Sequence, residues 1–200
     1  ISEGDRIGIV GRNGSGKSTL MKIMSAAETP DSGRVTKSND TRIGLLSQVD
    51  NAPAGATVRD VVLGNKPTHE WASDSGIREV FTGLFGGFDD HLFERTFGKL
   101  SGGEKRRVGL AKLLIDDLDL ILLDEPTNHL GARQAGEVLA VIKAAKERGL
   151  GVIFISHTLP HVLQVTDRIV VLRLVKIVAD APTSTFDAES LLGTITGLID

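Results

Sequence analysis

The chain has 200 residues, of which 40% are hydrophobic and 24% are charged, and this is the composition of an ordinary globular protein. Its 23 basic and 26 acidic residues leave a net charge of −3, so we expect no general attraction to nucleic acid and no direct DNA binding. The lack of cysteine excludes disulfide scaffolds, thiol nucleophiles and thiolate metal sites. No apolar run approaches the roughly 20 residues that a membrane-spanning helix needs.

The first quarter of the chain is predicted to begin with a strand, a glycine-rich loop and a helix. Residues 6–10 form a short apolar run that is typical of a buried strand, and the apolar residues of Lys17–Met24 have helical spacing. Residues 30–33 have the composition of a turn. Residues 34–37 and 41–48 after this turn are predicted to be two strands.

The middle of the chain has little strand character. From Thr57, a plausible N-cap, the apolar residues take helical spacing, and an interrupted helical pattern continues to about residue 95. We therefore expect residues 48–100 to form a helical subdomain inserted into the remainder of the chain.

The second half of the chain alternates helices with apolar runs. Residues 118–123 and 152–155 are apolar enough to be strands that are covered on both faces. We expect helices after residue 103, over 135–145 and over 187–197. Two further strands are expected over 169–172 and 174–178, where they can pair as a hairpin. This alternation predicts an α/β core of residues 1–47 and 101–200, with a mainly parallel sheet flanked by helices.

Residues 11–18 match the phosphate-binding pattern G-x-x-x-x-G-K-[ST] in full. Glycine lets successive main-chain N–H groups turn towards a polyanion, and the helix that follows adds its N-terminal amides. Lys17 is placed to reach the β- and γ-phosphates of a nucleotide, and Ser18 to offer a hydroxyl to Mg²⁺. The alternative, a glycine-rich turn that matches by chance, is disfavoured by the predicted strand before it and the predicted helix after it.

Two acidic residues, Asp124 and Glu125, follow the strand predicted over residues 118–123. Taken alone, such a pair is often an ordinary turn. With a phosphate loop in the same chain, Asp124 is expected to meet the magnesium shell and Glu125 to orient or deprotonate the attacking water.

Five motifs in this order resemble the ATP-binding cassette (ABC) ATPases, which are P-loop NTPases. They are the phosphate loop, Gln48 at the end of a predicted strand, residues 100–104 (Leu-Ser-Gly-Gly-Glu), residues 124–127 (Asp-Glu-Pro-Thr) and His157 after the next strand. The resemblance covers nearly the whole chain and implies one ABC nucleotide-binding domain over residues 1–200.

The resemblance also implies ATP and Mg²⁺ as ligands and a role for each matching residue. The implied catalytic residues are Glu125, His157, Gln48 and Lys17, and the implied magnesium site comprises Ser18, Gln48 and Asp124. The implied nucleotide-binding residues are Asn13, Gly14, Ser15, Gly16, Lys17, Ser18, Thr19, Ser101, Gly102 and Gly103. The last three act on ATP bound to a second cassette, so the resemblance implies a homodimer or a tandem partner.

The chain departs from the family pattern in two places. The antiparallel β-subdomain with which the family usually begins, and its adenine-stacking aromatic residue, are expected to be largely missing, because the first aromatic residue is Trp71. In addition, residues 1–130 resemble the ABC-F translation factors, whereas residues 131–200 resemble the ATPase subunits of sugar importers. We therefore expect a chimera, natural or engineered, that is joined near residues 128–131, where Gly131 stands in place of the usual aspartate.

Three functions remain open from the sequence. The first is a cytoplasmic ATP-hydrolysing subunit, soluble or held at the membrane face by separate permease subunits. The second is an ABC-F translation factor cassette associated with the ribosome. The third is a truncated or chimeric cassette that binds ATP with little or no turnover.

Overall fold

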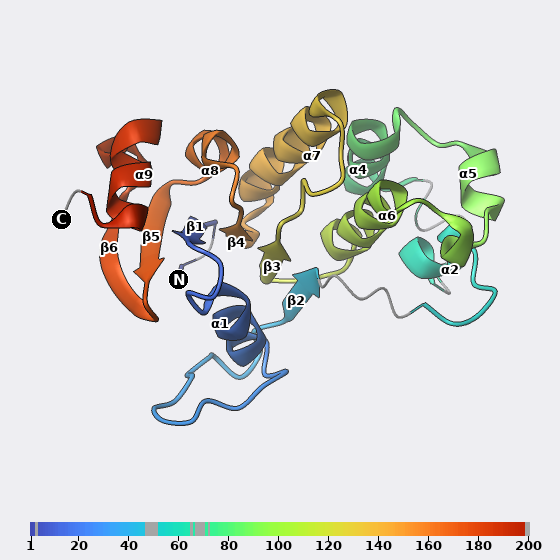
Figure 1. Ribbon diagram of the computed structural model, residues 1–200. Coiled ribbons are helices and arrows are strands. Elements are labelled where there is room, and N and C mark those ends of the chain that lie inside the picture. Colours follow the sequence, from blue (N-terminus) through green and yellow to red (C-terminus); the bar gives the residue numbers. More distant parts are fainter. Residues whose placement is uncertain (3, 47–51, 65, 67–70, 72, 199–200) are drawn as a thin grey trace. The chain divides into compact units, whose positions relative to one another are not determined.

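The computed structural model describes residues 1–2, 4–46, 52–64, 66, 71 and 73–198 (Figure 1). These residues form two compact units, and the chain passes from the first to the second and back twice. The first unit comprises Ile1–Leu45, Leu118–Pro126 and Ala145–Asp200, and the second comprises Leu46–Asp117 and Thr127–Ala144. The division into a core and a helical subdomain that we expect from the sequence stays a prediction.

The first unit is organised around a six-stranded sheet with the order β2-β3-β4-β1-β5-β6. Parallel pairing joins β3 to β4, β4 to β1 and β1 to β5, whereas β6 runs antiparallel to β5. The strands are β1 (Arg6–Gly11), β2 (Ile43–Leu46), β3 (Leu120–Asp124), β4 (Gly151–Ile155), β5 (Arg168–Arg173) and β6 (Lys176–Pro182). The predicted α/β class with a mainly parallel sheet is thus confirmed.

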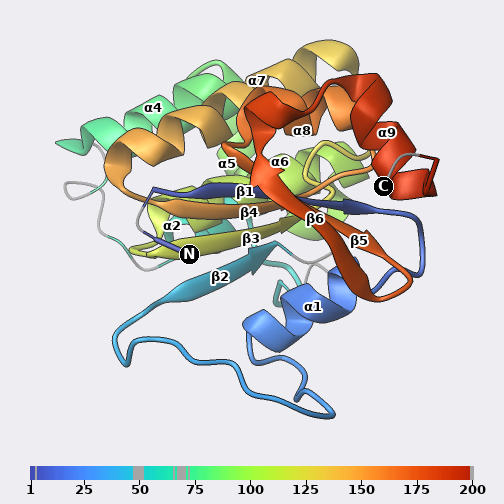
Figure 2. The same cartoon turned by 90° about the vertical axis from the view of Figure 1, so that its left-hand side faces the viewer.

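Helices of the first unit cover both faces of this sheet (Figure 2). On one face, α1 (Lys17–Met24) buries Met21 in an apolar cluster with side chains from β1, β3, β4 and β5. On the other face lie α8 (Leu159–Val165) and α9 (Ala188–Thr196). A Cβ on Gly8 of β1 would lie 2.6 Å from Val162 Cγ1, so α8 approaches the sheet closely only because residue 8 is glycine.

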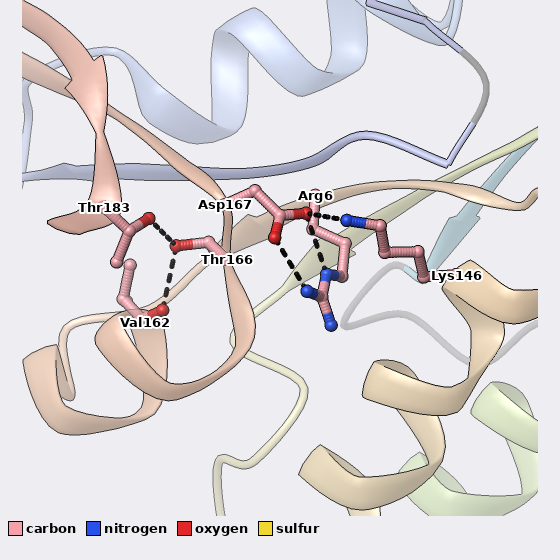
Figure 3. A network of polar contacts seen from close by, with 6 residues as sticks. All are labelled: Arg6, Lys146, Val162, Thr166, Asp167 and Thr183. Carbon is pink, nitrogen blue, oxygen red and sulfur yellow. Dashed lines mark hydrogen bonds and ion pairs between the residues drawn. The ribbon is translucent and has the colours of Figure 1, made fainter.

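A polar network ties the starts of β1 and β5 to a short 3₁₀ turn, η2 (Lys146–Arg148), within the first unit (Figure 3). The Asp167 carboxylate accepts hydrogen bonds from Arg6 Nη2 at 2.8 Å and Nε at 3.1 Å, and from Lys146 Nζ at 3.1 Å. The neighbouring Thr166 hydroxyl donates to the Val162 carbonyl at 2.9 Å. These contacts join the N-terminal ends of the parallel strands β1 and β5, at the end of the sheet opposite the phosphate loop.

The second unit is helical, with two 14-residue helices and shorter ones. Its helices are α2 (Val58–Leu63), α4 (Ser75–Phe85), α5 (Asp90–Glu94), the 3₁₀ turn η1 (Phe97–Lys99), α6 (Gly102–Ile115) and α7 (Ala132–Ala145), whose last residue is grouped with the first unit. Thr57 caps α2 in a capping box with Asp60, as the sequence predicts. Phe81 of α4 is fully buried among the rings of Phe85, Phe88 and Phe93.

Two sequence-based expectations differ from the structure. Residues 34–37 are predicted to be a strand, but they form an exposed loop, since no neighbouring strand among the described residues pairs with them. The strand predicted over 41–48 is limited to Ile43–Leu46 in the described part of the chain. By contrast, the C-terminal hairpin is present, and its two-residue turn is Leu174–Val175.

Candidate active site

The loop between β1 and α1 uses main-chain conformations that glycine adopts easily. Gly14 and Gly16 have φ angles of 80° and 94°, and Gly16 is the N-cap of α1 without a side-chain hydrogen bond to the helix. A Cβ on Gly11 would lie 2.2 Å from the carbonyl oxygen of Leu172. The first turn of α1 therefore lacks a side-chain cap, and an anion is a suitable partner for its amides.

Two polar groups of this loop have the environments expected of a phosphate site. Lys17 Nζ donates to the carbonyl oxygens of Gly11 at 2.8 Å and Arg12 at 3.1 Å, so it lies back over the loop. Burial lowers the pKa of Lys17, and the nearby carboxylates at the end of β3 oppose this shift. The Ser15 hydroxyl is buried and has no hydrogen-bond partner within the described residues. A buried hydroxyl without a partner, beside a lysine, fits a loop that receives a polyanion.

The carboxylate of Asp124, the last residue of β3, lies directly beside the phosphate loop. The Ser18 hydroxyl donates to Asp124 Oδ2 at 2.7 Å, although the two residues are 106 positions apart. Hydroxyl and carboxylate oxygens are ligands that Mg²⁺ accepts together with water and phosphate oxygens. The described residues hold no group of three or more histidine, cysteine, aspartate or glutamate side chains suited to a metal.

Glu125 is held in a strained conformation with a φ of 51°. Its own N–H donates to the Ile155 carbonyl at 2.9 Å. Its carboxylate accepts hydrogen bonds from the Ser156 hydroxyl at 3.1 Å and the His157 N–H at 2.8 Å, and lies 2.8 Å from His157 Nδ1. The structure thus brings Glu125 and His157 together, with the glutamate side chain largely buried and the histidine side chain exposed.

Two residues near Glu125 escape the sequence analysis. Ser156 is buried and bridges Glu125 to the Thr158 N–H, which donates to its hydroxyl at 3.1 Å. His161 lies on α8. Burial lowers its pKa, the charge of His157 lowers the pKa further, and Glu125 opposes both effects, so His161 interacts electrostatically with this pair. The sequence signal for Ser156 is its place between a buried strand and a histidine, whereas a histidine within a short helix carries no signal.

The second unit holds the Ser101-Gly102-Gly103 motif. Ser101 is the N-cap of α6 and forms a capping box with Glu104. A Cβ on Gly103 would lie 3.0 Å from the His129 carbonyl oxygen, so glycine allows the helix to approach this loop. A cavity of about 670 Å³ lies here, lined by Ser101, Gly102, Gly103, Glu104, Arg107, His129 and Gln134.

Two other predicted site residues, Asn13 and Thr19, are exposed to solvent. Asn13 is exposed in the phosphate loop, and Thr19 is exposed in the first turn of α1. Gln48 lies outside the described residues. The phosphate loop and the acidic pair belong to the first unit, and the Ser-Gly-Gly motif belongs to the second.

Comparison with known proteins identifies similar chains over most of this length. Residues 1–128 match a family model that is described as "ABC transporter". A "Probable anion import ATP-binding protein" of Haloferax volcanii is 28% identical over 86% of this chain and 69% of its own length. An "Energy-coupling factor transporter ATP-binding protein EcfA2" of Leuconostoc mesenteroides is 29% identical over 94% of this chain and 73% of its own.

Other relatives are much longer than this chain. A "Galactose/methyl galactoside import ATP-binding protein MglA" of Treponema denticola is 27% identical over 98% of this chain, which spans 43% of that protein. The solved structure of "a putative metal-chelate type ABC transporter" in "an inward-facing conformation" covers 98% of this chain and 79% of its own, with 25% identity and a TM-score of 0.78. Within the described residues, every helix is too short or too polar to cross a bilayer.

Proposed function

The chain belongs to the ABC transporter family and carries its P-loop ATPase domain, and we propose that it binds Mg·ATP and hydrolyses it in a site completed by a second cassette. The observation that supports this most directly is the hydrogen bond of 2.7 Å between Ser18 and Asp124. It brings the phosphate loop and the acidic end of β3 to one place, as a nucleotide with its metal requires.

Within this proposal the phosphate loop binds and orients the triphosphate. Main-chain N–H groups of residues 13–19 and the N-terminus of α1 receive the phosphate oxygens, and Lys17 contacts the β- and γ-phosphates. Ser18 would hold Mg²⁺ directly, Asp124 would support it and Gln48 would complete its surroundings. When bound, the ion neutralises charge on the β- and γ-phosphate oxygens.

Glu125 is proposed to orient and deprotonate the attacking water. Its carboxylate is aimed by the Ser156 hydroxyl and the His157 N–H, so it is positioned before substrate arrives. The exposed His157 side chain is proposed to contact the γ-phosphate through Nε2, while its Nδ1 lies against Glu125.

The Ser101-Gly102-Gly103 motif is proposed to serve ATP bound to a second cassette, in a homodimer or beside a tandem partner. Ser101 heads a 14-residue helix whose N-terminal amides suit an anion. Each cassette then contributes half of each site. Because relatives are named as transporter and import ATP-binding proteins, separate permease subunits at the cytoplasmic membrane face are the proposed partners.

The comparisons do not favour two expectations drawn from the sequence. Relatives named as import ATP-binding proteins match 98% and 94% of the chain, so each match extends to both sides of residues 128–131. They therefore give no support to a chimera, nor do they favour the ABC-F and ribosome interpretation. An ATP-binding cassette with little turnover remains the alternative that an experiment must exclude.

The test compares the parent chain with Glu125→Gln and with Glu147→Gln, a control at an exposed glutamate in η2. We expect the parent and the control to hydrolyse ATP, and Glu125→Gln to lose turnover by about 10²-fold or more while it forms an ATP-dependent dimer. Phosphate release and light scattering with and without Mg·ATP are the measurements. Equal rates in parent and Glu125→Gln would contradict the catalytic role, and the absence of any ATP-dependent dimer would contradict the composite site.

A further inference from the structure

Resting on the function proposed above, we infer that Arg95 is a positioning residue that prepares Ser101 for the phosphate of the partner-bound nucleotide by neutralising and orienting Glu104. Nothing in the sequence singles out Arg95, which precedes Glu104 by nine residues. The inference rests on contacts within the second unit alone.

The Glu104 carboxylate is shared between Ser101 and Arg95. Its Oε2 atom accepts from the Ser101 N–H and the Ser101 hydroxyl, both at 2.8 Å. Arg95 binds both oxygens, with Nη1 2.5 Å from Oε1 and Nη2 3.3 Å from Oε2. The Ser101 hydroxyl thus donates its proton to the same oxygen that Arg95 contacts.

This arrangement limits what Ser101 can offer to a ligand. Its hydroxyl has one proton, and the proton is used by Glu104. To donate to a phosphate, the hydroxyl must turn away from Glu104. A carboxylate that already accepts two hydrogen bonds from a guanidinium holds this proton less tightly than one without that partner, because donors compete for the same negative charge.

Arg95 also removes a charge conflict at the N-terminus of α6. A bare carboxylate 2.8 Å from the Ser101 oxygen would repel a phosphate that approaches the same helix end. The guanidinium forms a bidentate ion pair with Glu104, whose side chain is 24% exposed, and this pairing lowers the pKa of Glu104 to about 2. Glu104 can then cap the helix without presenting an uncompensated negative charge to the nucleotide.

The main chain around Arg95 is fixed, so its side chain reaches Glu104 from a defined place. The Arg95 carbonyl accepts from the Val58 N–H at 2.9 Å, and its N–H donates to the Leu92 carbonyl at 3.2 Å. Two residues on, Phe97 is buried, and its N–H donates to the Ala56 carbonyl at 2.9 Å. An ordinary surface ion pair between two mobile side chains would lack such anchoring.

The experiment measures the ATP concentration for half-maximal dimerisation of the full chain in a Glu125→Gln background. We expect Arg95→Met to raise this concentration by about tenfold, because a charge-assisted pair is lost and a bare carboxylate remains. Adding Glu104→Gln to Arg95→Met removes that carboxylate and is expected to restore the concentration to within about twofold of the background. Arg59→Met, which removes an ion pair with Glu94 in the same unit, is the control and leaves the concentration unchanged.

Thermal unfolding without nucleotide distinguishes positioning from a simple loss of stability. If Arg95→Met and Arg59→Met lower the melting temperature alike but only the first weakens dimerisation, the inference is supported. A normal response of Arg95→Met to ATP, or a defect that Glu104→Gln does not relieve, would overturn it while the proposed function stands. If the background chain itself fails to dimerise with ATP, and Ser101→Ala changes nothing, the proposed function fails and the inference falls with it.

Discussion

Replacing Asp167 by asparagine is expected to destabilise the first unit by about 1 kcal/mol at neutral pH. Asparagine keeps the shape of the side chain but removes the charge that binds Arg6 at 2.8 Å and Lys146 at 3.1 Å (Figure 3). The Arg6 side chain is only 11% exposed, so its guanidinium would be left in a confined place without a carboxylate. The three residues link two parallel strands and the η2 turn, so the substitution weakens contacts between all three elements.

The magnitude follows from the pKa of Asp167. Hydrogen bonds from Arg6 and then Lys146 lower this pKa from 3.8 to about 2, against an opposing effect of burial. At about 1.4 kcal/mol for each pH unit, such a shift corresponds to an upper limit of roughly 2.4 kcal/mol. Because the Asp167 side chain is 41% exposed, solvent screening reduces the expected contribution to about 1 kcal/mol.

The pH dependence has a definite sign. Since the pKa is lower in the folded than in the unfolded chain, the stabilisation is complete above about pH 4–5 and is lost as the pH falls towards 2. Urea unfolding of the parent and of Asp167→Asn, followed from pH 7 down to pH 3, is the assay. By pH 3 the difference between the two unfolding free energies is expected to fall to about half of its value at pH 7, because the folded-state pKa of about 2 lies below this range.

Glu28→Gln is the matched control for this measurement. It removes a single exposed ion pair with Lys22, 2.9 Å long, in the same unit, and is expected to leave the unfolding free energy nearly unchanged. A difference between parent and Asp167→Asn that is no larger than the control's, or that stays constant down to pH 3, would refute the reasoning about the network.

Three further variants test other features of the fold. Gly11→Ala is expected to lower the free energy of unfolding by about 3 kcal/mol and to abolish ATP binding, because the new Cβ would lie 2.2 Å from the Leu172 carbonyl oxygen. Calorimetry and nucleotide titration are the measurements, and a stable variant that binds ATP would contradict this expectation. Leu174→Asn combined with Val175→Gly is expected to raise the free energy of unfolding by about 1 kcal/mol, because both exposed residues have positive φ angles (50° and 63°) in a two-residue hairpin turn. An unchanged melting temperature would argue against backbone strain in this turn. Thr57→Ala removes the capping hydroxyl of α2 and is expected to cost about 1 kcal/mol in urea unfolding, and a change below about 0.3 kcal/mol would show that solvent replaces the cap.

Much of the candidate site was predictable because its signals are local. The phosphate loop needs glycine at fixed spacing and a lysine beside it, and these requirements are written in consecutive residues. The Thr57 cap was predictable for the same reason, since a side chain that caps a helix acts within three residues. The strand predicted over residues 34–37 was wrong, because strand formation depends on a partner that no local pattern supplies.

Contacts between residues of different elements could not be predicted from the sequence. Neither the placing of Ser156 and His161 around Glu125 nor the ion pair between Arg95 and Glu104 follows from any spacing. In each case the partners come from different elements, and their distance depends on how those elements pack.

The sequence by itself determined the alternation of strands and helices, the phosphate loop and the order of the motifs, because each depends on neighbouring residues and on the period of apolar side chains. Only the tertiary structure decided which carboxylate meets which hydroxyl, as Asp124 meets Ser18 across 106 residues of chain. Strand order and helix packing bring such groups together, and they arise from burial of the whole apolar surface, to which every element contributes at once.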